Sequence, residues 1–217
     1  MPRDTIVYVD GFNLYYGLVR NTAHKWLDLE ALCARVLPAE HHRVTRIKYF
    51  TAMVAPRPDD PQKATRQQLY LRALRTIPIV EIIYGHFLVH RVRLPLVNPT
   101  PTGPRTVEVL RAEEKGSDVN IATHLLCDAF DRAFEAAVVV SNDSDLVLPI
   151  SVVRNKFGLI VGVLNPHPGV PAVQLRRTAT FVKPIRRGVA SVAQFPRLLR
   201  DAKGRFERPP QWTGGMS

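Results

Sequence analysis

Short apolar runs alternate with amphipathic segments along this chain. The runs at residues 5–9, 44–52, 79–84, 136–140 and 159–164 are rich in valine and isoleucine, which is typical of buried β-strands. Between them, apolar residues recur at helical spacing over residues 28–37, 62–75, 117–130 and 145–156, and a short helix and a last strand at 180–182 are expected after residue 169. This alternation predicts an α/β fold, in which helices cover both faces of a mainly parallel sheet.

Residues 86–111 interrupt the alternation. Two extended stretches, 87–94 and 106–110, flank a proline-containing segment, 95–104, that cannot continue a helix. We expect a hairpin-like excursion here. The chain is therefore predicted to consist of an α/β domain over residues 1–185 and a basic C-terminal extension over residues 186–217, which includes one apolar stretch suited to docking.

Composition indicates a protein with one main core. The chain has 217 residues, and 46% of them are hydrophobic. Its two cysteines, Cys33 and Cys127, lie in helical apolar patterns and are expected to be reduced core residues, as in a cytoplasmic protein. No apolar run reaches the roughly 20 residues of a membrane span, so no membrane partner is expected.

Positive charge is concentrated at the C-terminal end. The formal net charge is +11, and residues 183–217 contain eight basic and two acidic residues. Such a field attracts polyanions, nucleic acid first, although a solvated basic tail would show the same composition. The candidate contacts to a nucleic-acid backbone are Arg66, Arg72, Arg186 and Arg187.

Three acidic segments carry the candidate chemistry. Asp10–Asn13 and Ser141–Asp145 each follow a strand-like run directly, and a third segment, Glu113–Asp118, is expected to open a helix that Ser117 caps. Strands of an open α/β sheet that end at carboxylates place those charges at one edge of the sheet. Carboxylates gathered there would repel one another unless a cation lay among them, and Mg²⁺ or Mn²⁺ prefers such oxygen ligands.

The same segments resemble a known family. Residues 8–14, 114–119 and 141–146 resemble, in this order, the motifs of the NYN domain, a branch of the PIN-like nuclease superfamily, and the resemblance covers residues 5–183. It implies a Rossmann-like α/β/α sandwich and a metal-dependent ribonuclease that uses one or two Mg²⁺ or Mn²⁺ ions on single-stranded or structured RNA. It also implies site residues: Asp10, Asp118 and Asp143 as metal ligands, Asp145 as a fourth catalytic carboxylate, and Asn13, Ser141, Asn142 and Lys115 as supporting residues.

Several of these roles have a simpler reading. Asp145 could be an ordinary carboxylate in the first turn of a helix. Lys115 could contact a scissile phosphate or be a solvated loop charge, and Asn13 could cap the next segment or orient Asp10.

Two other functions remain open from the sequence. One is a module that binds RNA without cleaving it, and the other is an enzyme of another class, such as one that hydroxylates an aromatic heterocycle. The second would need a flavin or nicotinamide, and the chain contains no Gly-x-Gly-x-x-Gly motif. Related nucleases often dimerise, so a homodimer is also an expectation, although no residue identifies an interface.

Overall fold

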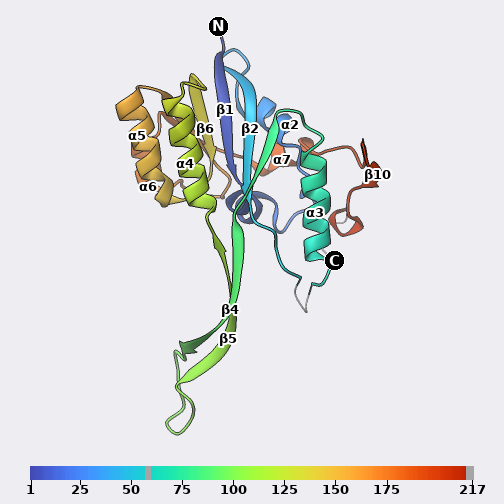
Figure 1. Ribbon diagram of the computed structural model, residues 1–217, viewed down its shortest axis with the longest axis vertical. Coiled ribbons are helices and arrows are strands. Elements are labelled where there is room, and N and C mark those ends of the chain that lie inside the picture. Colours follow the sequence, from blue (N-terminus) through green and yellow to red (C-terminus); the bar gives the residue numbers. More distant parts are fainter. Residues whose placement is uncertain (57–59, 214–217) are drawn as a thin grey trace.

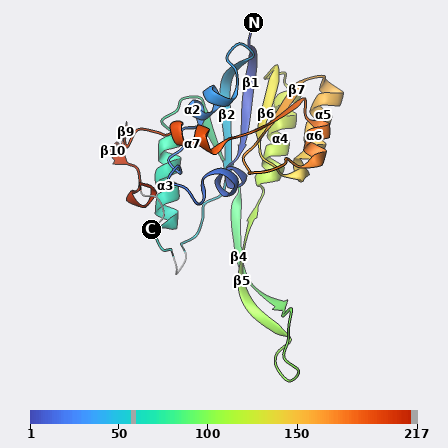
Figure 2. The ribbon, with the colours of Figure 1, turned by 180° about the vertical axis from the view of Figure 1, so that it is seen from behind.

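A six-stranded parallel sheet forms the centre of the protein. The computed structural model describes residues 1–56 and 60–213, and Figures 1 and 2 show the sheet between two groups of helices. Its strand order is β3-β2-β1-β6-β7-β8. The strands are β1 (Arg3–Asp10), β2 (His42–Thr51), β3 (Val80–Tyr84), β6 (Ala136–Val140), β7 (Ile160–Asn165) and β8 (Phe181–Pro184). The predicted α/β sandwich with a mainly parallel sheet is confirmed.

Side chains of β1 alternate between two cores, because successive residues of a strand point to opposite faces of the sheet. Val7 and Val9 pack in one core with α2 (Leu29–Val36) and α3 (Lys63–Leu74). Ile6 and Tyr8 pack in the other with α4 (Ser117–Phe130), α5 (Val147–Phe157) and α6 (Val173–Thr178). The central strands are therefore buried on both faces, which explains their continuous apolar sequences.

The segment after β1 turns sharply. A four-residue helix, α1 (Gly11–Leu14), continues into a π-helical turn, η1 (Tyr15–Val19). Gly17 in this turn lies against the loop after β7, where a Cβ atom would come within 2.8 Å of the His167 ring. A larger residue at position 17 would therefore push these two loops apart.

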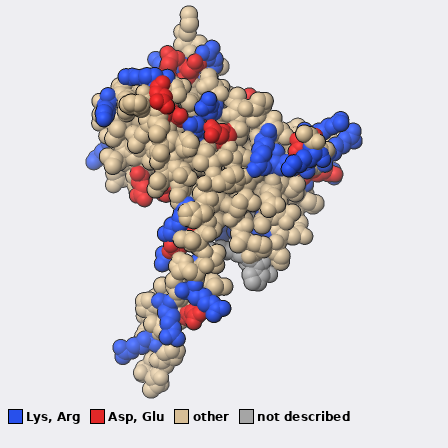
Figure 3. Space-filling view, in the orientation of Figure 1, with Lys and Arg blue, Asp and Glu red and all other residues tan. Residues whose placement is uncertain are grey.

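The predicted hairpin is an arm that projects away from the sheet. Strands β4 (His86–Pro95) and β5 (Thr106–Lys115) pair in antiparallel register, from His86 opposite Lys115 to Pro95 opposite Thr106 (Figure 1). Lysine and arginine side chains lie along this arm in the space-filling view of Figure 3. The arm leaves β3 and returns to the start of α4, so its base adjoins the edge of the sheet where the acidic segments end.

Helix α4 covers the predicted range, 117–130, but the segment before it differs from the expectation. Strand β5 was predicted over residues 106–110 and extends to Lys115. Gly116, not Ser117, is the N-cap, with a left-handed φ of 97° that favours glycine. Pairing with β4 keeps the polar run extended, and this long-range contact cannot be seen in the local sequence pattern.

The C-terminal extension packs on the domain. It forms α7 (Arg187–Val192), a hairpin of β9 (Leu198–Asp201) and β10 (Gly204–Glu207), and a 3-10 turn, η3 (Pro210–Trp212). The buried Trp26 indole donates a hydrogen bond to the Pro196 carbonyl at 2.9 Å, and its ring contacts those of Phe206 and Trp212. The hairpin was not predicted from the sequence.

Arg72 fastens this hairpin to α3. Its guanidinium donates two hydrogen bonds of 2.7 Å to the Asp201 carboxylate and one of 3.1 Å to the Gly204 carbonyl, and it lies 4.1 Å from the centre of the Phe206 ring. Arg72 therefore holds the extension in place, rather than presenting its charge to solvent.

Acid is expected to release this contact only near pH 2. The hydrogen bonds from Arg72 lower the pKa of Asp201 from 3.8 to about 2. Because the pKa is lowered in the folded state, the stabilisation is complete above the ordinary pKa and is lost as the pH falls through the folded value. Fluorescence of Trp26 and Trp212 between about pH 5 and pH 2 will measure the release. The variant Arg72→Gln should change at a higher pH than the wild type, and identical transitions would contradict the assignment.

One of the two cysteine predictions is wrong. Cys33 is buried, as expected, and burial raises the pKa of its thiol to about 12. Cys127 is exposed on α4, whose inward side presents Ile121, Leu125 and Ala129 instead. In the part of the chain that is described, no helix is both long and apolar enough to cross a bilayer.

Candidate functional site

The candidate site lies at the carboxyl ends of β1 and β6, where the order in which the chain adds strands to the sheet reverses. From β1 the chain builds β2 and β3 on one side, and after the arm it builds β6, β7 and β8 on the other. Val9 of β1 is paired with Val140 of β6, so Asp10 and Ser141 leave adjacent strands side by side at their carboxyl ends. Open α/β sheets bind ligands in the crevice at such a switch point.

Asp10 is a buried carboxylate with fixed orientation. It is only 5% exposed, and as the N-cap of α1 it accepts a hydrogen bond from the Asn13 N–H at 2.9 Å through Oδ1. Its Oδ2 accepts a hydrogen bond from the Ser141 hydroxyl at 3.2 Å. A carboxylate is costly to bury without hydrogen-bond partners. Asp10 has one partner just after β1 and another just after β6, and together they fix the orientation of its carboxylate.

Ser141 joins Asp10 to Asp143. The hydroxyl oxygen that donates to Asp10 also accepts the backbone N–H of Asp143 at 3.1 Å. Asp143 in turn caps the short 3-10 helix η2 (Ser144–Leu146) by accepting the Asp145 N–H at 2.9 Å through Oδ1. Asp10 and Asp143 thus belong to one hydrogen-bonded unit. Asp145 lies on its exposed side, within η2 and before the start of α5.

A second set of contacts ties in the loop after β7. The Asn13 side-chain oxygen accepts the Asn142 N–H at 3.0 Å and is also 3.0 Å from His167 Nε2. Because this oxygen is an acceptor, Nε2 of His167 carries the proton and donates it. Asn142 Oδ1 accepts the Ala172 N–H at 2.9 Å. Loops from three strand ends are therefore locked together by Asn13 and Asn142.

His167 was not identified from the sequence. It lies in the Asn-Pro-His-Pro-Gly segment, which was interpreted only as a turn. The available signal was its position: the segment follows β7, whose carboxyl end lies at the same edge as Asp10 and Ser141. The Asn165 side-chain oxygen fixes the segment by accepting the His167 N–H at 2.9 Å.

The third acidic segment, Glu113–Asp118, spans the end of β5 and the start of α4. Asp118 lies in the first turn of α4, half-buried, just after the base of the arm. Lys115 is exposed at the end of β5, where its ammonium lies 2.7 Å from Glu113, and this hydrogen bond lowers the pKa of Glu113. Asp118 is thus on the same side of the molecule as the switch point, while Lys115 is paired within the arm.

The four arginines occupy different environments. Arg72 holds the extension, and Arg66 forms an ion pair with Asp60 and is 17% exposed. Arg186 and Arg187 are exposed and border a hollow of about 450 Å³ that His167 also lines. Only the last two are placed both beside the site and open to solvent.

The donor set suits a hard divalent cation. Among the described residues, no three His, Cys, Asp or Glu side chains form a group that could hold a metal ion. Mg²⁺ is bound through one or two carboxylates, however, and keeps several waters or takes phosphate oxygens of a substrate. The Asp10–Ser141–Asp143 unit supplies two carboxylates of this kind, so its chemistry fits such an ion.

A Rossmann-like α/β fold with a polar site at the switch point defines the class of this protein. The family model described as "NYN domain" matches residues 4–184, and the chain belongs to the NYN domain family. This membership places it among nuclease-type domains, which typically use divalent metals.

Two known proteins are similar to the chain. One is 6-hydroxy-3-succinoylpyridine 3-monooxygenase HspA of Pseudomonas putida (strain DSM 28022 / S16), 30% identical over 240 residues, covering 98% of this chain and 76% of that protein. The other is the crystal structure of a protein of unknown function from Vibrio parahaemolyticus RIMD 2210633, with a TM-score of 0.53 at 19% identity, covering 85% of this chain and 94% of that one. The second likeness concerns the fold alone.

Proposed function

We propose that this protein is a metal-dependent ribonuclease that hydrolyses RNA phosphodiester bonds at the Asp10–Ser141–Asp143 unit. The observation that carries the proposal is the buried Asp10 carboxylate at the switch point of an NYN-family sheet, oriented from two strand ends and joined through Ser141 to the backbone of Asp143. The strong net positive charge of the chain supports a polyanionic substrate.

In this proposal, different residues bind the metal, orient its ligands and contact the RNA. Asp10 and Asp143 would hold a Mg²⁺ or Mn²⁺ ion, and Asp118 and Asp145 would add negative charge nearby. When bound, the ion would supply an activated water and neutralise charge on the phosphate. Ser141 and Asn13 keep Asp10 in one orientation, and His167 orients the side chain of Asn13. Arg186 and Arg187 contact the RNA backbone beside the site.

The test is RNA cleavage by the purified chain with labelled single-stranded and hairpin RNAs. Cleavage is expected with Mg²⁺ or Mn²⁺ and not with EDTA. The variant Asp143→Asn is expected to lower the rate at least about tenfold, since it removes one ligand charge. The matched control is Asp131→Asn at the opposite, C-terminal end of α4, which should cleave like the wild type.

Cleavage that is unaffected by both EDTA and Asp143→Asn would contradict the proposal. Salt-sensitive RNA binding without products would instead indicate a binding module.

A second candidate is favoured by one finding. The relative from Pseudomonas putida is named as a monooxygenase of a substituted pyridine, and it is similar over nearly the whole of this chain. Hydroxylation of an aromatic heterocycle is therefore the alternative function. It requires a redox cofactor, and absorbance of the purified protein at roughly 450 nm would reveal a bound flavin. A flavin spectrum together with inactivity on RNA would favour this alternative.

A further inference from the structure

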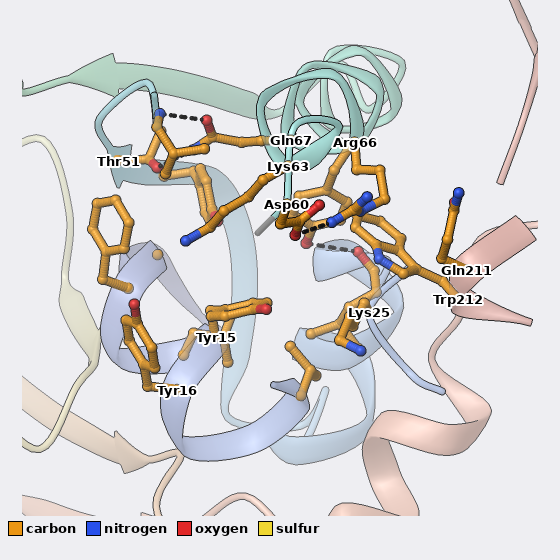
Figure 4. Close-up of a pocket in the computed structure, with 18 residues that line it drawn as sticks. Tyr15, Tyr16, Lys25, Thr51, Asp60, Lys63, Arg66, Gln67, Gln211 and Trp212 are labelled. Carbon is orange, nitrogen blue, oxygen red and sulfur yellow. Dashed lines mark hydrogen bonds and ion pairs between the residues drawn. The ribbon is translucent and has the colours of Figure 1, made fainter. Parts of the chain in front are cut away.

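A separate cavity of about 460 Å³ lies on the α3 side of the sheet. Its walls come from three parts of the chain that are far apart in sequence: the turn after β1, helix α3 and the C-terminal extension. Figure 4 shows Tyr15, Tyr16 and Lys25 on one side, with Lys63, Arg66 and Gln67 of α3 opposite them. The volume lies in the range of sites that enclose most of a small ligand.

Aromatic rings form much of the wall. Tyr15 and Tyr16 meet edge to face with ring centres 5.3 Å apart. Deeper in the fold, Tyr70 contacts both Tyr49, at 6.2 Å, and Trp212, at 6.3 Å, in the same edge-to-face manner. Such rings present flat apolar faces and positively polarised edges, a combination that suits an aromatic guest.

The polar part of the lining is predominantly cationic. Lys25, Lys63 and Arg66 line the cavity, and Asp60 is the one acidic residue among the described lining residues. Asp60 accepts a hydrogen bond from Arg66, and the three basic residues outnumber this one carboxylate. Burial, and then the charge of Arg66, lower the pKa of Lys25. The positive charges of Lys25 and Arg66 therefore repel each other, and an anion between them would relieve this repulsion.

The extension completes the cavity. Trp212 and Gln211 of η3 form part of its wall, and the Gln211 side-chain amide donates a hydrogen bond to the Gln62 side-chain oxygen, just before α3, at 3.1 Å. Trp212 is 9% exposed and packs against Trp26. The opposite wall includes the π-helical turn η1, a geometry that often marks functional sites.

We propose that this cavity binds a small planar aromatic molecule that carries a carboxylate. The rings of Tyr15, Tyr70 and Trp212 take the flat part, and Lys25 with Arg66 takes the anionic group. Gly11 and Phe12, the residues directly after Asp10, also line the cavity, so it lies next to the candidate active site. The inference rests on the lining alone and stands independently of the ribonuclease proposal.

The experiment is a binding titration with two aromatic acids, 2-naphthoate and nicotinate, each paired with its neutral amide. Intrinsic fluorescence of Trp26 and Trp212 and calorimetry provide the readouts. At least one acid is expected to bind, and its amide is expected to bind about tenfold more weakly, because it lacks the charge that Lys25 and Arg66 would contact.

Variants locate the binding. Lys25→Gln is expected to weaken binding of the acid about tenfold, and Trp212→Phe is expected to reduce the fluorescence response while the fold is kept. The matched control is Lys156→Gln on α5, on the opposite face of the sheet, which removes the same charge and should leave binding unchanged. Circular dichroism shows whether each variant is folded.

Equal affinity for acid and amide, no binding of either acid, or equal loss in the Lys25 and Lys156 variants would overturn the inference. Displacement of the bound acid by a short RNA would overturn it as well, because the cavity would then be a nucleotide subsite. Binding is also measured in the Asp143→Asn protein, where it should be unchanged. Failure of the ribonuclease proposal and failure of this one are therefore distinguishable.

Discussion

Changing Asp10 to asparagine is expected to lower the rate of RNA cleavage at least about a hundredfold while the fold is retained. The asparagine oxygen can accept the Asn13 N–H, and its NH2 group can donate to the Ser141 hydroxyl oxygen, so both contacts can be kept. It removes the negative charge, however, and a hard divalent cation prefers carboxylate oxygen. The measurement is the initial cleavage rate over a range of Mg²⁺ concentrations, with circular dichroism as the check on folding.

The variant Ser141→Ala tests how much the orientation of Asp10 matters, because it removes a hydrogen bond to Asp10 and keeps the negative charge. Ser141 donates to Asp10, so its loss should weaken metal affinity or activity by about 10–100-fold and raise the Mg²⁺ concentration needed for half-maximal rate. Additional Mg²⁺ should restore much of the rate in this variant and little of it in Asp10→Asn. An Asp10→Asn protein that cleaves RNA at the wild-type rate would exclude Asp10 from the reaction.

Changing Lys48 to methionine is expected to destabilise the fold by about 3–5 kcal/mol. The Lys48 side chain is 4% exposed, and its ammonium lies 2.6 Å from Asp128 Oδ2 and 3.2 Å from His124 Nδ1. The Tyr8 hydroxyl also donates to Asp128 at 2.6 Å, and burial raises the pKa of this phenol. Removing the ammonium leaves a largely buried carboxylate with Tyr8 as its one remaining side-chain partner among these groups. Urea unfolding monitored by circular dichroism gives the free energy of unfolding.

Replacing both partners should recover most of the loss. In Lys48→Met/Asp128→Leu no charge is left uncompensated, and buried ion pairs replaced by apolar residues are often neutral in stability. Removing the exposed pair between Arg43 and Asp4 by Arg43→Met is the control, and it should have a much smaller effect. If Lys48→Met unfolded at the same urea concentration as this control, the buried pair would not stabilise the fold.

The strands and helices were largely readable from the sequence, because their signals are local. Alternation along β1 separates residues for the two cores, and Asp28 caps α2 by accepting the Ala31 N–H at 2.9 Å. The polar run before α4 was not predicted to be part of β5, because polar residues carry no periodicity and the contact with β4 decides their conformation.

The acidic segments were likewise identified locally, two directly after apolar runs and the third at the start of a predicted helix. The sequence could not show that Ser141 joins Asp10 to Asp143, or that His167 contacts Asn13, 154 positions away. Nor could it show that Arg72 is held by Asp201. These relations depend on the order of strands in the sheet and on where the extension docks.

By itself, the sequence determined the alternation of strands and helices, the family motifs and the excess of positive charge, since each depends on residues that are neighbours along the chain. The tertiary structure decided which carboxylates share a hydrogen-bonded unit, which arginines remain exposed, and that the turn after β1, α3 and the extension enclose a cavity. The physical reason is that these features arise from contacts between segments distant in sequence, and no local pattern of residues encodes such a contact.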